Sequence, residues 1–250
     1  MRLLVINANT STNITERVAK AARAAASPGT EIVPVTGTFG ARVISTRSEG
    51  AIATHAAVEL AAKHSGRCDA VMIAVSLDTG LGALRELLSI PVVGMTEAAC
   101  LIACTLGTRF GVVTLGTRTI PLYEELIAGY GLERRLAGVR AVDIEPRHYN
   151  EMERIDQGVA ELANALVAGN GAEVIVLAGA AIAGRHGPLQ EKLGVPALDG
   201  TACGVQLAEL LVRLGPKKPT RGSYARPGPK EVVNVDPELI RFFSEPNRPE

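Results

Sequence analysis

The stretch "VMIAVSLDTGLGALREL" (71–87) has the pattern of a buried strand, a turn that contains glycine, and a helix. A continuous apolar run followed by a turn and a helical pattern is typical of a parallel α/β protein. Ligands of open α/β sheets bind beyond the carboxyl ends of the strands. The residues that follow this strand, from position 75 onward, are therefore the first place to look for a functional site.

The same alternation of strands and helices extends over most of the chain. We expect strands at 2–9, 31–36, 70–76, 91–95, 109–115, 139–144, 173–179 and 195–199, and helices at 12–26, 48–65, 80–88, 97–106, 119–129, 151–169, 186–193 and 201–214. Strands that alternate with helices at this spacing form parallel sheets with right-handed crossovers. After Leu214 the chain is rich in proline and has little periodicity, which predicts a tail that wraps the body or is partly mobile.

An internal repeat divides this pattern into two halves. The segment "AVSLDTG…IPVVGMTEAA" (74–99) aligns with "AGAAIAG…VPALDGTACG" (178–204), so that Ala74 matches Ala178 and Thr96 matches Thr201. The repeat predicts an α/β fold of two pseudo-symmetric Rossmann-like domains with parallel sheets and a cleft between them. We expect one domain to comprise 1–97 and the tail 206–250, and the other to comprise 98–205. Positions 75–76 and 179–180 should then meet across the cleft.

Composition limits the functional classes. The 250 residues are 47% hydrophobic and 3% aromatic, and 26 basic residues balance 26 acidic ones, which argues against nucleic acid as a partner. The four cysteines form no CxxC, and neither a signal peptide nor a long apolar span is present, so we expect a cytoplasmic protein without membrane partners. No metal-ligand spacing occurs, and no GxGxxG follows the first strand, so we expect no metal and no cofactor. The alanine-rich surface favours a homo-oligomer.

Four segments carry a family resemblance: "VINANTS" (5–11), "GLGALRELLSIPVVGMTEAA" (80–99), "VVTLGTRTIPLYEELIAGYGLERR" (112–135) and "GVPALDG" (194–200). In this order and spacing they resemble the aspartate/glutamate racemase superfamily, and within it the hydantoin and allantoin racemases. The resemblance implies cofactor-free stereoinversion by two thiols, one at each pseudo-symmetric strand end. One thiolate removes a proton from an acidic carbon while the other thiol delivers one to the opposite face.

The sequence departs from the family pattern at both thiols. Val75 stands where the resemblance places the first cysteine, and Gly179 stands where it places the second. Cys100 and Cys104 lie one turn apart in an alanine-rich helix, and Cys203 lies in the equivalent helix of the second repeat, where buried cysteine behaves as a small hydrophobe. Neither valine nor glycine can carry a proton, so the two-thiol mechanism is not expected here.

Three functional hypotheses remain open. The first is a cofactor-independent enzyme that acts on a small cyclic ureide or carboxylate by ring opening, decarboxylation or isomerisation. The second is a hydantoin or allantoin racemase with residual activity, or a variant from which both cysteines were removed. The third is a non-catalytic protein that binds a small molecule. Exchange of the substrate's α-hydrogen with heavy water distinguishes the second hypothesis from the others.

Polar residues at strand ends supply the candidate site. Ser76 and Thr119 are candidate catalytic donors by the resemblance, and His148 is a candidate base because an imidazole titrates near neutral pH. The candidate substrate-binding residues are Asn9, Ser11, Val75, Thr117, Arg118, Gly179 and Ala180.

Four further residues have alternative interpretations. Asp78 is expected to cap the helix that follows it, and Asp199 is equally compatible with a turn and with the cleft. His186 and Tyr149 lie in loops that can reach the cleft.

Overall fold

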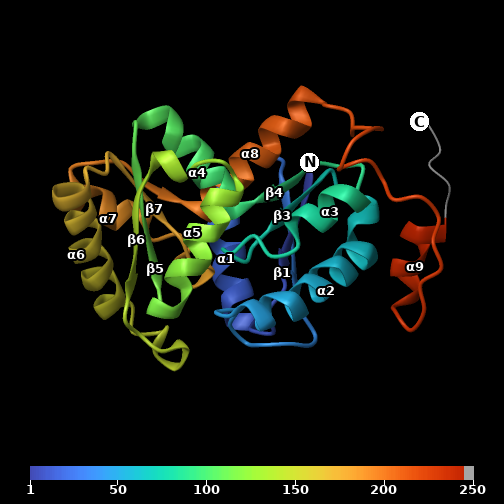
Figure 1. The fold of residues 1–250 in the computed structure, drawn as a ribbon, viewed down its shortest axis with the longest axis horizontal. Helices are drawn as coiled ribbons and strands as arrows, with labels where there is room; N and C mark the ends of the chain where they lie inside the picture. The colour runs from blue at the N-terminus through green and yellow to red at the C-terminus, as the bar shows by residue number, and fades with distance from the viewer. Residues whose placement is uncertain (245–250) are drawn as a thin grey trace.

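In a computed structural model of the protein, which describes residues 1–244, the chain forms two four-stranded parallel sheets (Figure 1). The first sheet has the order β2-β1-β3-β4 and the second the order β6-β5-β7-β8. The strands are β1 (Arg2–Asn7), β2 (Glu31–Thr36), β3 (Ala70–Ile73), β4 (Val92–Gly94), β5 (Phe110–Leu115), β6 (Leu136–Val142), β7 (Val174–Leu177) and β8 (Ala197–Asp199). We call the sheet β1–β4 with its helices the first half, and the sheet β5–β8 with its helices the second half.

Helices connect the strands and cover both sheets. They are α1 (Thr12–Ala25), α2 (Arg47–His64), α3 (Leu81–Leu87), α4 (Met95–Leu106), α5 (Ile120–Gly129), α6 (Met152–Asn170), α7 (His186–Leu193), α8 (Gly200–Leu214) and α9 (Pro237–Ser244). Local sequence explains where several begin. The Thr46 hydroxyl accepts the Glu49 amide hydrogen at the start of α2, and the Asp199 carboxylate accepts two amide hydrogens at the start of α8. Such side-chain caps satisfy amide groups that have no partner within the helix.

The predicted α/β fold of two similar parallel sheets is confirmed. Most strands and helices agree with the prediction within three residues. The strands predicted at 70–76 and 173–179 are shorter, because the chain leaves the sheet after Ile73 and after Leu177. In the second sheet, β6 starts at Leu136, three residues before the prediction, and its pairing with β5 shifts register beside Gly138. That irregularity interrupts the alternation on which a sequence-based assignment depends.

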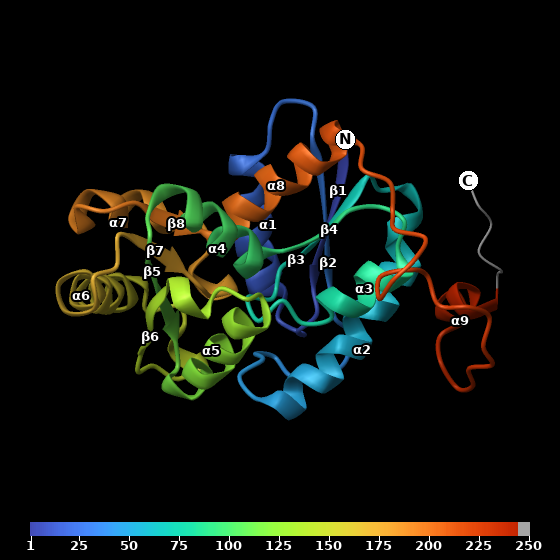
Figure 2. The same cartoon turned by 45° about the horizontal axis from the view of Figure 1, so that its top comes forward.

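Two helices pack against each other between the sheets. Cys100 and Ala103 of α4 belong to the same buried cluster as Cys203 and Ala208 of α8, and Figures 1 and 2 show both helices near the middle of the molecule. The expected domain boundaries at 97/98 and 205/206 fall inside these two helices and remain a prediction. The shared cluster fixes the two halves relative to each other.

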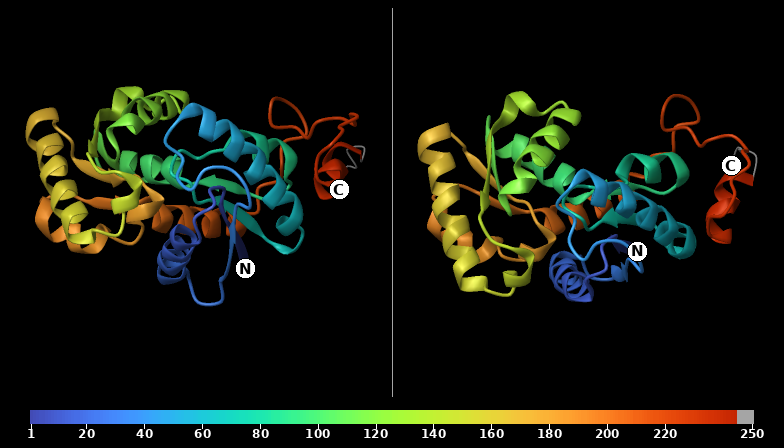
Figure 3. Two further views of the ribbon diagram at one scale, coloured as in Figure 1. Left: turned by 90° about the horizontal axis from the view of Figure 1, so that it is seen from below. Right: turned by 60° about the horizontal axis from the view of Figure 1, so that its bottom comes forward.

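The tail after α8 lies along the first half. The Lys218 ammonium donates to the carbonyl oxygens of Arg85 at 3.0 Å and Leu88 at 2.8 Å, at the end of α3. Farther on, Leu239 of α9 is buried in a cluster with Ala62 and Leu87. Figure 3 shows α9 at the end of the molecule that is remote from α6. The sequence predicted the wrapping course as one alternative but did not predict α9. No helix within residues 1–244 is long and apolar enough to cross a bilayer.

Candidate active site

A small cavity lies where residues that follow strands of both sheets come together. Its volume is about 50 Å³. Val75 and Ser76, which follow β3, face Gly179 and Ala180, which follow β7, as the repeat predicted. The lining comprises Asn9, Ile14, Val43, Ile44, Ser45, Val75, Ser76, Thr114, Leu115, Thr119, Tyr123, Tyr149, Gly179, Ala180 and Ala181.

A hydrogen-bonded pair of hydroxyls joins the two halves inside this cavity. The Ser76 hydroxyl oxygen lies 2.5 Å from the Tyr123 phenol oxygen, and either group can donate. Tyr123 is buried, and burial raises the pKa of its phenol to about 12, although hydrogen bonds with Ser76 and Thr114 act in the opposite direction. The phenol is therefore neutral at neutral pH. A neutral phenol is suited to donating a hydrogen bond and is not a base.

Asn9 lies in the cavity wall at the carboxyl end of β1. Its side-chain oxygen accepts hydrogen bonds from Asn7 Nδ2 and from the Ser11 amide, both at 2.9 Å. A ligand would therefore meet the Asn9 NH₂ group, which is a donor. Ser11 itself does not line the cavity, and its side chain makes no capping hydrogen bond although it precedes α1.

The remaining predicted site residues divide into two groups. Thr119 lines the cavity, and its hydroxyl donates to the Gly116 carbonyl at 2.8 Å. Thr117 and Arg118 are exposed in the short turn before α5 and lie outside the lining. The structure does not bring His148 to the cavity either, because its Nδ1 lies 2.5 Å from Glu151 Oε1, away from the lining.

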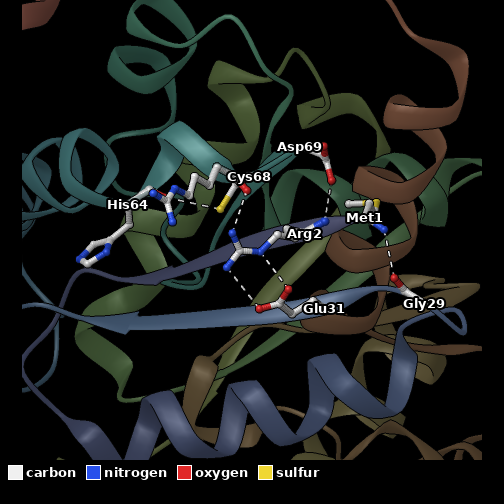
Figure 4. Close-up of polar contacts among 8 residues, drawn as sticks. Met1, Arg2, Gly29, Glu31, His64, Cys68 and Asp69 are labelled. Carbon is white, nitrogen blue, oxygen red and sulfur yellow. Dashed lines mark hydrogen bonds and ion pairs between the residues drawn. The ribbon is translucent and has the colours of Figure 1, made fainter.

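None of the four cysteines, all of which lie within the described residues 1–244, lines the cavity. Cys100 and Cys203 are buried, and burial raises the pKa of both thiols, that of Cys203 to about 12. Cys68 lies beside Arg2 and Asp69 at the amino ends of β1 and β3, the opposite edge of the first sheet (Figure 4). Its thiol donates to the His64 carbonyl oxygen at 3.4 Å. The buried thiols are packing groups, in agreement with the prediction.

Asp78, two residues after Ser76, is a buried carboxyl group that does not line the cavity. It accepts hydrogen bonds from the Thr96 amide at 3.1 Å, the Glu97 amide at 2.8 Å and the Tyr130 phenol at 2.7 Å. Burial raises the pKa of Asp78 to about 7, against the opposing effect of these three donors. Asp78 therefore caps α4, and the expectation that it caps the next helix in the sequence is wrong. Gly94 allows this approach, because a Cβ atom there would lie 2.5 Å from Asp78 Cγ.

Asp199 has the corresponding structural role in the second half. It accepts the amide hydrogens of Thr201 and Gly184, the first at 2.6 Å, and so links the start of α8 to the loop that precedes α7. Burial alone would raise the pKa of Asp199, but His186 and the backbone donors lower it below its usual value. Neither His186 nor Asp199 lines the cavity. No group of three or more potential metal ligands comes together within the described part of the chain.

Tyr123 and Thr114 line the cavity but were not predicted from the sequence, and Tyr149 was predicted to reach the cleft without a role. A signal for Tyr123 was available. It follows Thr119 by four residues, so the two side chains share one face of the helical segment. Thr114 lies within the apolar strand β5 and gave no local signal.

The chain belongs to the Asp/Glu/hydantoin racemase family, whose model matches residues 3–208. Within this family it is similar to hydantoin and allantoin racemases. The hydantoin racemase of Pseudomonas sp. (strain NS671) is 33% identical over 240 residues, which cover 94% of this chain and 95% of that protein. The crystal structure of allantoin racemase from Pseudomonas fluorescens superposes with a TM-score of 0.91 at 39% identity and covers 94% of this chain and 100% of that one. Allantoin racemase from Klebsiella pneumoniae gives a TM-score of 0.90 at 34% identity, covering 96% and 98%.

Proposed function

We propose that this protein binds a small cyclic ureide or carboxylate in the cavity between its halves and transforms it without exchanging a proton between two thiols. One observation carries the proposal. The two equivalent strand ends place Val75 and Gly179 against the cavity, and the lining within residues 1–244 contains no thiol, imidazole, amine or carboxylate. By the family resemblance, these two positions are the ones that hold the thiols of a racemase.

The charge states of the lining argue against a two-base reaction. Racemisation needs a base on one face of the reacting carbon and an acid on the other. Among the lining residues that the structure describes, only the phenols of Tyr123 and Tyr149 titrate, and burial raises the pKa of both. Neither phenol is a base at neutral pH.

Decarboxylation is the reaction that this lining supports best. A carboxylate beside a carbonyl can leave as CO₂ when the bonding electron pair passes to the carbonyl as an enolate, and no base removes a proton in that step. The hydrogen-bonded pair of Ser76 and Tyr123 can donate one hydroxyl hydrogen to such an oxyanion, whereas the Thr119 hydroxyl already donates to the Gly116 carbonyl. Val75 and Leu115 form an apolar wall, against which an unpaired carboxylate is poorly solvated. A phenol then protonates the carbon and regains its proton from solvent. Ring opening and isomerisation require a base or an activated water, which this lining does not supply.

Racemisation of a ureide is a second candidate. It is supported by the identity of 33–39% with hydantoin and allantoin racemases over at least 94% of this chain. In this case the proton acceptor would be water. Ureide binding is common to both candidates.

Incubation in heavy water distinguishes the two candidates. The substrates are hydantoin-5-carboxylate, a ureide with a carboxylate beside a carbonyl, and allantoin, and the reaction is followed by proton NMR. We expect hydantoin-5-carboxylate to lose CO₂ and to give a product that contains deuterium. We expect no exchange of the α-hydrogen of allantoin. Fast exchange of the allantoin α-hydrogen would contradict decarboxylation as the function and support racemisation. A ligand-induced rise in melting temperature without turnover of either compound would identify a binding protein.

A further inference from the structure

We infer that Arg17 of α1 is a positioning residue, which holds the second-half wall of the cavity from the first half. This inference rests on the proposed function only in taking the cavity to be the ligand site.

The contacts of Arg17 cross from one half to the other. Its Nη1 donates to the carbonyl oxygens of Ala181 and Tyr149, the second at 3.3 Å, and lies 3.5 Å from the Met152 sulfur. Ala181 and Tyr149 both line the cavity, although they belong to separate loops of the second half. One guanidinium therefore ties two parts of the wall to α1. Ile14, one turn earlier on α1, also lines the cavity.

Comparison of the two repeats shows why the second wall needs such a tie. In the first half, the Thr96 hydroxyl donates to the Ser76 carbonyl at 2.5 Å and fixes the segment after β3. The matching Thr201 hydroxyl is buried and has no hydrogen-bond partner within residues 1–244. The segment after β7 lacks the corresponding bond, and Arg17 supplies the restraint from outside the repeat.

The charge environment supports a positioning role. Arg17 is partly buried, and burial together with the nearby Arg185 lowers the pKa of its guanidinium. Arg185 is itself paired with Asp156, at 3.0 Å between Nε and Oδ1. In the described chain, the hydrogen-bond acceptors of Arg17 are two carbonyl oxygens and a thioether. Desolvation of a cation is unfavourable, and these acceptors offset part of that cost for the guanidinium.

The test compares Arg17→Met, which keeps the length of the stem, with Arg17→Lys, which keeps the charge. Arg23→Met is the matched control, because Arg23 is an exposed arginine on the same helix. Hydrogen–deuterium exchange is measured for the segments 147–152 and 179–184, with 94–99 as an internal reference. Titration calorimetry measures binding of hydantoin and allantoin.

In Arg17→Met we expect exchange in 147–152 and 179–184 to rise about tenfold, since a tenfold change corresponds to loss of about one hydrogen bond. Exchange in 94–99 should not change, and ligand affinity should fall by about the same factor. Arg17→Lys should show a smaller rise in exchange and a smaller fall in affinity than Arg17→Met, and Arg23→Met should show neither change. Unchanged exchange in the two wall segments of Arg17→Met would overturn the inference, and so would a uniform rise over all three segments. If the wild-type protein binds neither probe, the proposed function fails while the exchange data still decide the role of Arg17.

Discussion

The Ser76 hydroxyl and the Tyr123 phenol lie 2.5 Å apart and form a direct hydrogen bond between the two halves of the protein. Ser76 follows β3 of the first sheet, and Tyr123 lies on α5 of the second half. Any movement of one half relative to the other changes this distance. The pair therefore makes the donor arrangement in the cavity dependent on how the halves pack.

Tyr123→Phe removes the phenol from this pair while keeping the ring. We expect turnover to fall at least tenfold, because loss of one donor to an oxyanion costs about 10²–10³ in rate in other enzymes. The free energy of unfolding should fall by about 1–2 kcal/mol, since the buried Ser76 hydroxyl loses a partner. Steady-state kinetics and urea unfolding measure the two effects. Tyr224→Phe, at a half-exposed tyrosine outside the cavity, is the control. Unchanged turnover in Tyr123→Phe would show that the Tyr123 phenol does not take part in the reaction.

Introducing cysteines at the two strand ends should have unequal effects on stability. Val75→Cys replaces one small apolar side chain by another of similar size and should cost less than about 1.5 kcal/mol. Gly179 has φ +148°, a backbone region that side chains rarely adopt, so Gly179→Cys should cost about 1–3 kcal/mol.

Urea unfolding of each single variant checks this difference, with Gly169→Ala as the control. Gly169 lies in α6 with open space at its Cβ position, and alanine there should stabilise the protein by about 0.5–1 kcal/mol. Equal destabilisation by Val75→Cys and Gly179→Cys would contradict the strain argument. Recovered racemisation in the double variant would show that the rest of the pocket is suited to a racemase.

The meeting of Val75 and Gly179 could be predicted from the sequence for a simple reason. Both follow apolar strands at matching places in a repeat, and two similar parallel sheets that share one cleft bring the carboxyl ends of their strands to it. The prediction required no knowledge of side-chain contacts. For the same reason it did not include the distance between these residues, or which other side chains complete the wall.

The features that were missed depend on contacts between residues far apart in the chain. Asp78 reaches the start of α4 because β4 pairs beside β3, and nothing near Asp78 in the sequence indicates this. His148 was expected at the cavity from its loop position, but Glu151 binds its ring, and Tyr149 lines the cavity instead. A loop position determines which end of the sheet a segment visits. It does not determine which of two neighbouring side chains points inward.

Asp78 should make stability depend on pH in a definite direction. An unfolded aspartate titrates near pH 4, whereas burial raises the pKa of Asp78 to about 7 in the folded protein. Between these values the folded state binds a proton that the unfolded state has lost. The contribution of Asp78 to stability is therefore fully present below about pH 4 and is lost as pH rises through about 7.

In Asp78→Asn the fall in unfolding free energy between pH 5 and pH 8 should be smaller than in the wild type by about 2 kcal/mol. Urea unfolding at the two pH values measures this change. Tyr130→Phe is the companion variant, because it removes a donor that lowers the pKa of Asp78 and should move the transition to higher pH. Glu97, which contacts Arg85 in an ion pair, is the other nearby carboxylate and remains in both variants. An unaltered pH profile in Asp78→Asn would show that Asp78 is not the titrating group.

The ion pair of His186 with Asp199 should be visible in the titration of the imidazole. His186 Nδ1 lies 3.8 Å from Asp199 Oδ2, and this carboxylate raises the pKa of His186 above its usual 6.5, against the effect of partial burial. The stabilisation from this pair is present below pH 6.5 and is lost as pH rises through the folded pKa of His186.

Asp199→Asn keeps a good N-cap residue for α8 but removes the charge, and Asp199→Ala removes both. NMR titration of the imidazole protons should show the pKa of His186 lowered in both variants, with the exposed His64 as an internal reference. Urea unfolding should show Asp199→Ala to be less stable than Asp199→Asn by about 1 kcal/mol. A lowered His186 pKa in Asp199→Ala alone would mean that helix capping, and not the carboxylate charge, holds the imidazole in its protonated form.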